Sequence, residues 1–116
     1  MLRSGFSLLL VIPALLVAVP ALAADPVKLT LKNNRFGSPA VTAPAGERLH
    51  IVVENQDETP AEFESHDLRV EKFIAPRGRI TVRVGPLKPG SYKFFDDYHP
   101  DTATGTLTVV KKLATE

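Results

Sequence analysis

The sequence VKLTLKNN at residues 27–34 alternates apolar and polar side chains over six positions and then breaks. A period of two predicts a β-strand with one buried face, because successive side chains of a strand point to opposite sides. Asn33 and Asn34 predict a turn, since asparagine tolerates the left-handed backbone conformation. The globular part of the chain therefore begins with a strand and a tight turn.

Further segments predict strands on the same criterion. They are separated by Pro, Gly and Asn, and they lie at residues 41–43, 49–53, 70–75, 80–84, 92–96 and 106–110. No run shows the 3.6-residue period of a helix. Seven or so short strands with turn residues between them predict an all-β fold, an antiparallel sandwich or barrel.

The N-terminal stretch predicts a secretory signal peptide. Arg3 precedes an apolar run at residues 6–19, and Ala21-Leu22-Ala23 offers an A-x-A cleavage site. Pro13 interrupts this run, which is also short for a membrane span of about 20 residues, so an uncleaved anchor is the weaker alternative. We therefore expect a signal peptide at residues 1–23 and one domain at residues 24–116.

Composition removes several classes of function. Without Arg3, thirteen basic residues balance thirteen acidic ones, which argues against a nucleic-acid partner. The chain has no cysteine, and its one methionine is Met1. Disulfides, thiolate catalysis and sulfur-ligated metals are therefore excluded from the mature domain. No cysteine is present for acylation, so we expect the mature protein not to be embedded in the membrane.

Two segments are dense in residues that bind metal ions. In the first, at residues 61–67, strand alternation puts Glu62, Glu64 and His66 on one face and Phe63 on the other. The second, at residues 94–101, runs from an aromatic strand into a loop. It contains Asp96, Asp97 and His99.

Either segment alone is adequately explained as solvated polar residues at a strand end. Their combination in one small domain favours a metal site, because carboxylates and imidazole are ligands for iron and for Cu(II). We interpret His50, which lies in mid-strand, as structural or exposed, and the Arg77-Gly78-Arg79 turn as solvated. Hydrolysis by Glu62 and Glu64 is a weak alternative, since no Gly-x-Ser-x-Gly or H-E-x-x-H motif is present.

The whole mature chain resembles the cupredoxin family. The resemblance rests on Phe36-Gly37-Ser38-Pro39, Pro44-Ala45-Gly46, Asn55-Gln56-Asp57, an aromatic strand, a His-Pro step and Gly105-Thr106-Leu107-Thr108-Val109. It implies a Greek-key β-sandwich of about seven to eight strands, with the two ligand segments meeting at one end.

The resemblance also implies where a blue copper site would fall. Ala61 or Glu62 takes the place of the first histidine, Asp96 that of the cysteine and His99 that of the second histidine, while Thr102 and its neighbours offer no thioether. A blue copper centre is excluded, because it requires a thiolate.

A narrower resemblance is to the cupredoxin-like periplasmic proteins of bacterial ferrous-iron uptake. Its motifs are Pro60-Ala61-Glu62-Phe63-Glu64-Ser65, Ile74-Ala75-Pro76-Arg77-Gly78 and Leu87-Lys88-Pro89-Gly90-Ser91-Tyr92. This similarity implies a periplasmic protein that binds iron, with or without a copper ion, and oxidises Fe(II) for a membrane iron permease. The expected ligands are Glu62, Glu64, His66, Asp96, Asp97 and His99. The alternative is a non-catalytic interaction module that has lost its metal and docks a permease or another periplasmic protein.

Overall fold

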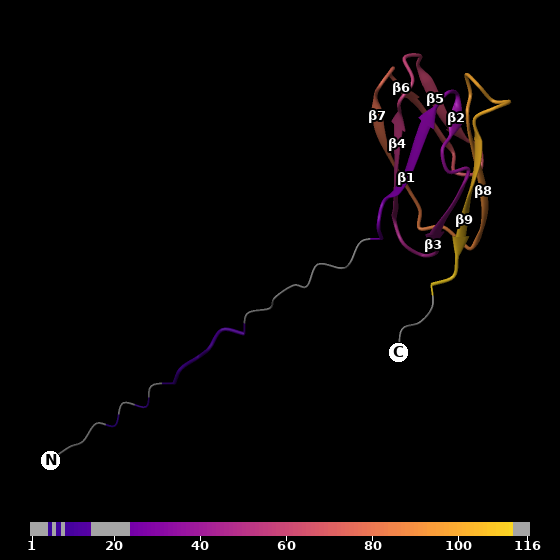
Figure 1. Cartoon of the computed structure of the whole chain (residues 1–116). Coiled ribbons are helices and arrows are strands. Elements are labelled where there is room, and N and C mark those ends of the chain that lie inside the picture. Colours follow the sequence, from indigo (N-terminus) through magenta and orange to yellow (C-terminus); the bar gives the residue numbers. More distant parts are fainter. Residues whose placement is uncertain (1–4, 6, 8, 15–23, 113–116) are drawn as a thin grey trace.

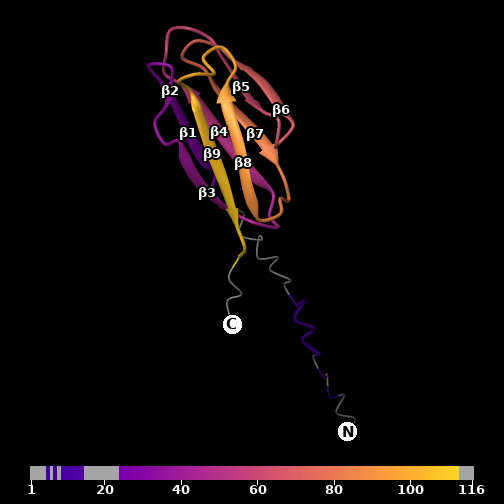
Figure 2. The same cartoon turned by 90° about the vertical axis from the view of Figure 1, so that its right-hand side faces the viewer.

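The structure is a computed structural model that describes residues 5, 7, 9–14 and 24–112. Within these residues, nine strands form two sheets packed face to face (Figures 1 and 2). Sheet A has the order β2-β1-β4-β7, and sheet B has the order β3-β9-β8-β5-β6. The strands are β1 Val27–Lys32, β2 Arg35–Phe36, β3 Ala40–Pro44, β4 Leu49–Asn55, β5 Ala61–Ser65, β6 Val70–Ile74, β7 Arg79–Val84, β8 Gly90–Asp96 and β9 Thr104–Val110.

The all-β sandwich predicted from the sequence is confirmed, and the described residues contain no helix. The antiparallel pairing expected from the sequence holds for most neighbouring strands, but two pairs differ. β1 pairs with β4 in parallel, and β3 pairs with β9 in parallel. The parallel pair in sheet A arises because the chain crosses to sheet B to form β3 before it returns as β4.

The core lies between the two sheets and is filled by the inward side chains of both. Phe94 is its centre: its ring meets Phe36 edge-on, with 5.0 Å between ring centroids, and lies 5.6 Å from the ring of Phe63. Gly105 of β9 lies against the same ring, and a Cβ atom there would come within 2.4 Å of two Phe94 ring carbons. The Phe94 ring therefore requires glycine at this position.

The Asn55-Gln56-Asp57 turn holds several loops together. Asn55 is buried, and its amide group donates hydrogen bonds to the carbonyl oxygens of Thr59 and Ala75. The Asp57 carboxylate accepts hydrogen bonds from the backbone N–H groups of Asn33 and Asn34. Both asparagines have positive φ angles, so Asp57 stabilises the left-handed turn between β1 and β2. These bonds secure the end of the sandwich at which β5 begins.

The N-terminal prediction falls mostly outside the described residues. Of the expected signal peptide, residues 1–4, 6, 8 and 15–23 are not described, and of the expected domain, residues 113–116 are not. Residues 9–12 are exposed. Among the described residues, no helix is long and apolar enough to cross a membrane. The signal peptide and its cleavage after Ala23 stay a prediction.

Candidate metal site

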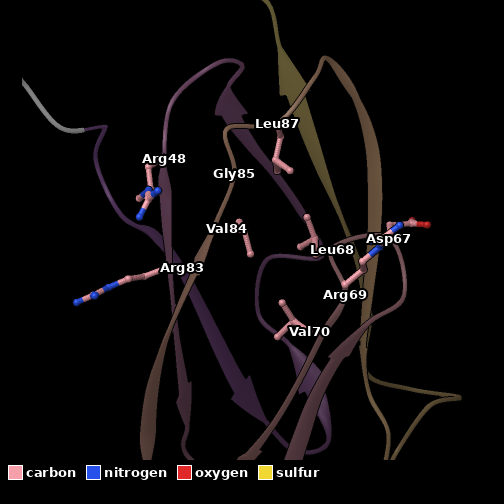
Figure 3. Close-up of a pocket in the computed structure, with 9 residues that line it drawn as sticks. All are labelled: Arg48, Asp67, Leu68, Arg69, Val70, Arg83, Val84, Gly85 and Leu87. Atoms are coloured by element: carbon pink, nitrogen blue, oxygen red, sulfur yellow. The ribbon is translucent and has the colours of Figure 1, made fainter.

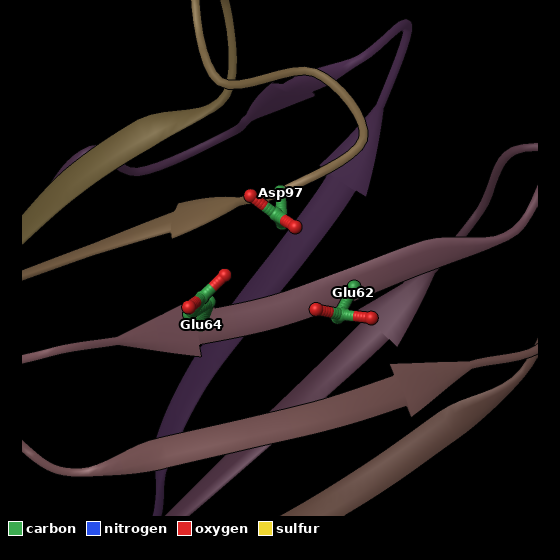
Figure 4. Close-up of side chains that lie close together, drawn as sticks. All are labelled: Glu62, Glu64 and Asp97. Carbon is green, nitrogen blue, oxygen red and sulfur yellow. The ribbon is translucent and has the colours of Figure 1, made fainter.

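Three carboxylates meet on the outer face of sheet B, and we call them the acidic trio (Figure 4). Glu62 and Glu64 are alternate residues of β5, so both point away from the core while Phe63 between them is fully buried. Asp97 directly follows β8, the neighbouring strand, in which Phe95 pairs with Glu64. One carboxylate oxygen from each residue lies within 4.8 Å of the others. The fold therefore brings Asp97, from the second predicted segment, next to Glu62 and Glu64, from the first.

A fourth carboxylate, Glu71, belongs to the same face. It pairs with Glu64 in the β5–β6 register. A side-chain hydrogen bond with Glu71 is the main cause that raises the pKa of Glu62, followed by partial removal from water and repulsion from Asp97 and Glu64. Partial removal from water, then repulsion from Asp97 and Glu71, raises the pKa of Glu64. The site is therefore a place where negative charges repel one another.

Glu71 is absent from the residues predicted from the sequence, although the spacing of the strands indicates it. Only four residues separate Ser65 from Val70, which is a usual length for a β-hairpin loop. Pairing the flanking segments as a hairpin puts Glu71 opposite Glu64. Tyr98 was also missed. Partial removal from water, and then the Glu62 carboxylate, raise the pKa of its phenol, so its side chain lies beside the trio.

Asp96 and His99 form a separate pair. Asp96 is only 2% exposed, and its Oδ2 atom lies 2.9 Å from Nδ1 of His99. Its Oδ1 atom accepts hydrogen bonds from the backbone N–H groups of Glu62, at 2.9 Å, and Tyr98, at 3.1 Å. Both carboxylate oxygens of Asp96 therefore have partners within the protein. Asp96 does not join the acidic trio.

The Asp96 carboxylate orients the His99 ring. Because an ionised carboxylate only accepts hydrogen bonds, Nδ1 of His99 carries the proton and Nε2 keeps its lone pair. The His99 side chain is 31% exposed, and its ring is held by a compact loop in which the N–H of Asp96 donates to the carbonyl of Ala103. A carboxylate that fixes a partly exposed imidazole in this way is the usual support for a metal-binding histidine.

His66 lies at the edge of the acidic trio. The strand ends at Ser65, and the His66 side chain is 80% exposed. Its Nδ1 atom is 4.0 Å from a Glu64 oxygen, and its ring lies 5.5 Å from that of Phe95. The structure thus puts His66 beside Glu64, as the alternation predicted, but without a tight contact. His50 is exposed on the outer face of sheet A, whereas both clusters belong to sheet B and the loop that follows β8.

Comparison with known proteins identifies the family. The sequence profile described as "Cupredoxin-like domain" matches residues 5–109. The chain belongs to this cupredoxin-like family. It is 42% identical over 83 residues to an uncharacterised protein of Rickettsia prowazekii (strain Madrid E), a match that covers 72% of this chain and 66% of the relative, slightly less than two thirds of its length.

Solved structures of amicyanin share the fold. The structure of amicyanin from Paracoccus versutus (Thiobacillus versutus) is similar with a TM-score of 0.58 and 19% identity, over 74% of this chain and 82% of that one. A Cu(I) form of an amicyanin mutant gives a TM-score of 0.61 and 12% identity, over 78% of this chain and 95% of that one. The cupredoxin-like fold expected from the motifs is therefore confirmed.

Proposed function

We propose that this chain is a periplasmic protein of iron uptake that binds iron at the acidic trio, oxidises Fe(II) and delivers the ion to a membrane iron permease. The observation that carries the proposal is the meeting of Glu62, Glu64 and Asp97 within 4.8 Å. Among the described residues, no lysine or arginine forms an ion pair with any of the three. A bound cation relieves their repulsion.

The donor set selects the kind of metal. Carboxylate oxygens are hard ligands that suit iron, and they stabilise Fe(III) relative to Fe(II). Binding at such a site favours the transfer of one electron from Fe(II) to a Cu(II) ion, which gives Fe(III) and Cu(I). The His99 imidazole adds a nitrogen donor that suits Cu(II) as well as iron. A blue copper centre does not fit, because the chain has no cysteine to supply the thiolate.

The residues divide into two roles under this proposal. Glu62, Glu64 and Asp97 bind the ion directly. The ring nitrogens of His99 lie outside this group of three, so His99 joins it through Nε2 only after its loop moves. Asp96 acts through His99, because its own oxygens are already hydrogen-bonded. His66 is near enough to Glu64 to take part only after its side chain moves. Metal affinity falls in acid, since the ligands must lose their protons to bind.

Calorimetric titration tests the proposal. Residues 24–116, treated with a chelator, are titrated with Cu(II) and, without oxygen, with Fe(II). We expect saturable binding that Glu62→Gln and His99→Ala each weaken by about 10-fold or more. Glu54→Gln is the matched control, because it removes an equivalent carboxylate from the opposite sheet. Absence of saturable binding, or an equal loss in the Glu54→Gln variant, would overturn the proposal.

A second function is favoured by one specific observation. Asp96 occupies the position that the resemblance gives to the copper-binding cysteine, and it is used there to bind the backbone of Glu62 and Tyr98. These hydrogen bonds alone account for an aspartate at position 96, so its presence there does not require a bound metal. Under this alternative the domain is a non-catalytic interaction module that docks a permease or another periplasmic protein. Indifference to both metals in the titration supports it.

A further inference from the structure

The outer face of sheet A is strongly basic. Its exposed side chains point outward by strand alternation. The register of the strands makes neighbours of His50 and Arg83 and of Lys32 and Arg35, while Lys28 lies beside Val52. In the part of the chain that the structure describes, this face has one carboxylate, Glu54, and six basic residues: Lys28, Lys32, Arg35, Arg48, Arg79 and Arg83. Of the six, only Arg79 has an ion-pair partner among the described residues, at 3.2 Å from Glu54.

The opposite face of the sandwich is acidic. Among the described residues, the outer face of sheet B carries the acidic trio and Glu71. Its basic side chains are Lys93, within β8, and Arg69, which lines a hollow with Glu64 and Glu71 at one edge of the sheet. The whole chain has a formal net charge of only +1, so its composition conceals this separation. The two layers of the sandwich thus carry opposite charges on their solvent-facing sides.

Two of the basic residues, Lys28 and Arg79, line a hollow of about 240 Å³ on the outer face of sheet A, but Glu54, which forms an ion pair with Arg79, lines it as well. A groove of about 460 Å³ lies between β7 and the β5–β6 turn, with Leu68 and Leu87 among its apolar lining residues (Figure 3). Arg48 and Arg83 border it but project together away from these apolar side chains (Figure 3). Their guanidinium groups therefore belong to the outer face of sheet A. A small anion would need cations that point at one spot with no carboxylate beside them, whereas Glu54 lines the first hollow and Asp67 lines the second.

The face also lacks what a hydrophobic interface needs. Its outward positions in β1, β4 and β7 contain no aromatic residue, and Val52, the one aliphatic side chain among them, is half-buried. Protein interfaces are usually centred on buried aromatic or apolar side chains. Dispersed lysines and arginines over a sheet face complement an extended anionic surface instead.

We propose that the outer face of sheet A docks on the anionic headgroup surface of a lipid bilayer, with the acidic face of sheet B directed away from it. Each lysine or arginine near such a surface strengthens binding by about fivefold. The acidic face is repelled by the same surface, so the charge separation sets the orientation as well as the affinity. The interaction is electrostatic and weakens as salt shortens the Debye length.

Vesicle binding of residues 24–116 tests the proposal, since this part contains every strand and every core side chain described. We expect binding to phosphatidylcholine vesicles that contain phosphatidylglycerol, and none to pure phosphatidylcholine. Binding at about 0.05 M salt is lost at about 0.5 M. The double variant Lys28→Glu/Arg83→Glu should bind at least about 25-fold more weakly.

The matched control is Lys93→Glu/Lys111→Glu. It changes the net charge of the chain by the same amount, but Lys93 lies on the outer face of sheet B and Lys111 follows β9. We expect it to bind as the wild type does. An equal loss in both double variants would show an effect of net charge alone and would overturn the proposal. Circular dichroism checks that each variant keeps the fold.

The absence of cysteine allows a direct test of orientation. A polarity-sensitive dye on Thr81→Cys, on the outer face of sheet A, should respond to the vesicles, whereas the same dye on Thr108→Cys, on sheet B, should not. A larger response at position 108 would refute the orientation. Binding to a polyglutamate peptide without binding to anionic vesicles would replace the lipid surface with an acidic protein partner.

Discussion

Substitution of Asp96 separates its part in folding from its part in metal binding. In Asp96→Ala, the N–H groups of Glu62 and Tyr98 and Nδ1 of His99 lose their acceptor. Hydrogen bonds to a buried charge contribute about 1.5–3 kcal/mol each, and water regains access to some of the freed groups. We therefore expect the free energy of unfolding to fall by about 3–5 kcal/mol.

Asp96→Asn should be much milder for stability. The asparagine carbonyl oxygen can still accept from the backbone of Glu62 and Tyr98, so we expect a loss of about 1–2 kcal/mol. The amide NH₂ then faces Nδ1 of His99 and donates to it. The proton of the imidazole consequently moves to Nε2, which loses the lone pair that a metal would use. Metal affinity should fall even though the fold is kept.

Urea denaturation measures the stability of both variants, and long-range ¹H–¹⁵N correlation spectra report which His99 nitrogen carries the proton. Asp101→Asn is the control: Asp101 is an exposed aspartate in the same loop, and we expect it to change neither the stability nor the tautomer. Equal destabilisation by alanine and asparagine at position 96, or an unchanged His99 tautomer in Asp96→Asn, would refute the reasoning.

Three further predictions concern the acidic face and the turns. Because its neighbours raise the pKa of Glu62, the folded protein holds the proton of the Glu62 carboxyl group more firmly than the unfolded chain does. The free energy of unfolding should therefore fall as the pH rises from about 4.5 through the pKa of the folded state. In thermal melts, Glu62→Gln should show a flatter pH profile and a higher Tm at neutral pH. Gly105→Ala forces a Cβ atom against the Phe94 ring and should lower the free energy of unfolding, measured by urea denaturation, by about 1–3 kcal/mol. In the control Gly37→Ala the new Cβ atom has only one backbone oxygen near it, 3.8 Å away, so the loss should be about 0.5 kcal/mol or less. Equal losses would contradict the steric argument. Asp57→Ala removes the acceptor of two backbone N–H groups in the β1–β2 turn and should cost about 1–2 kcal/mol, with amide hydrogen exchange accelerated at those two groups; unaltered exchange would show that Asp57 does not hold the turn.

The sequence predicts which two segments form the candidate site, but it does not predict which residues of those segments meet. The alternation around Phe63 correctly put Glu62 and Glu64 on one outward face, because strand geometry leaves little choice for neighbouring residues. Whether Asp96 or Asp97 would join them depended on where β8 ends. Asp96 is the last residue of β8 and points inward, so Asp97 is the residue that reaches the outer face. That boundary depends on the bonds of the 97–103 loop, which residue types alone do not reveal.

The pattern of residues alone determines the strands and their buried faces, since the period of two is local and fixes which side chains face the core. It also excludes a blue copper centre, because no thiolate is encoded. Only the tertiary structure decides which strands become neighbours, because pairing joins residues far apart in the sequence. The crossover through β3, the meeting of β5 with the end of β8, and the separation of basic and acidic faces all follow from that pairing.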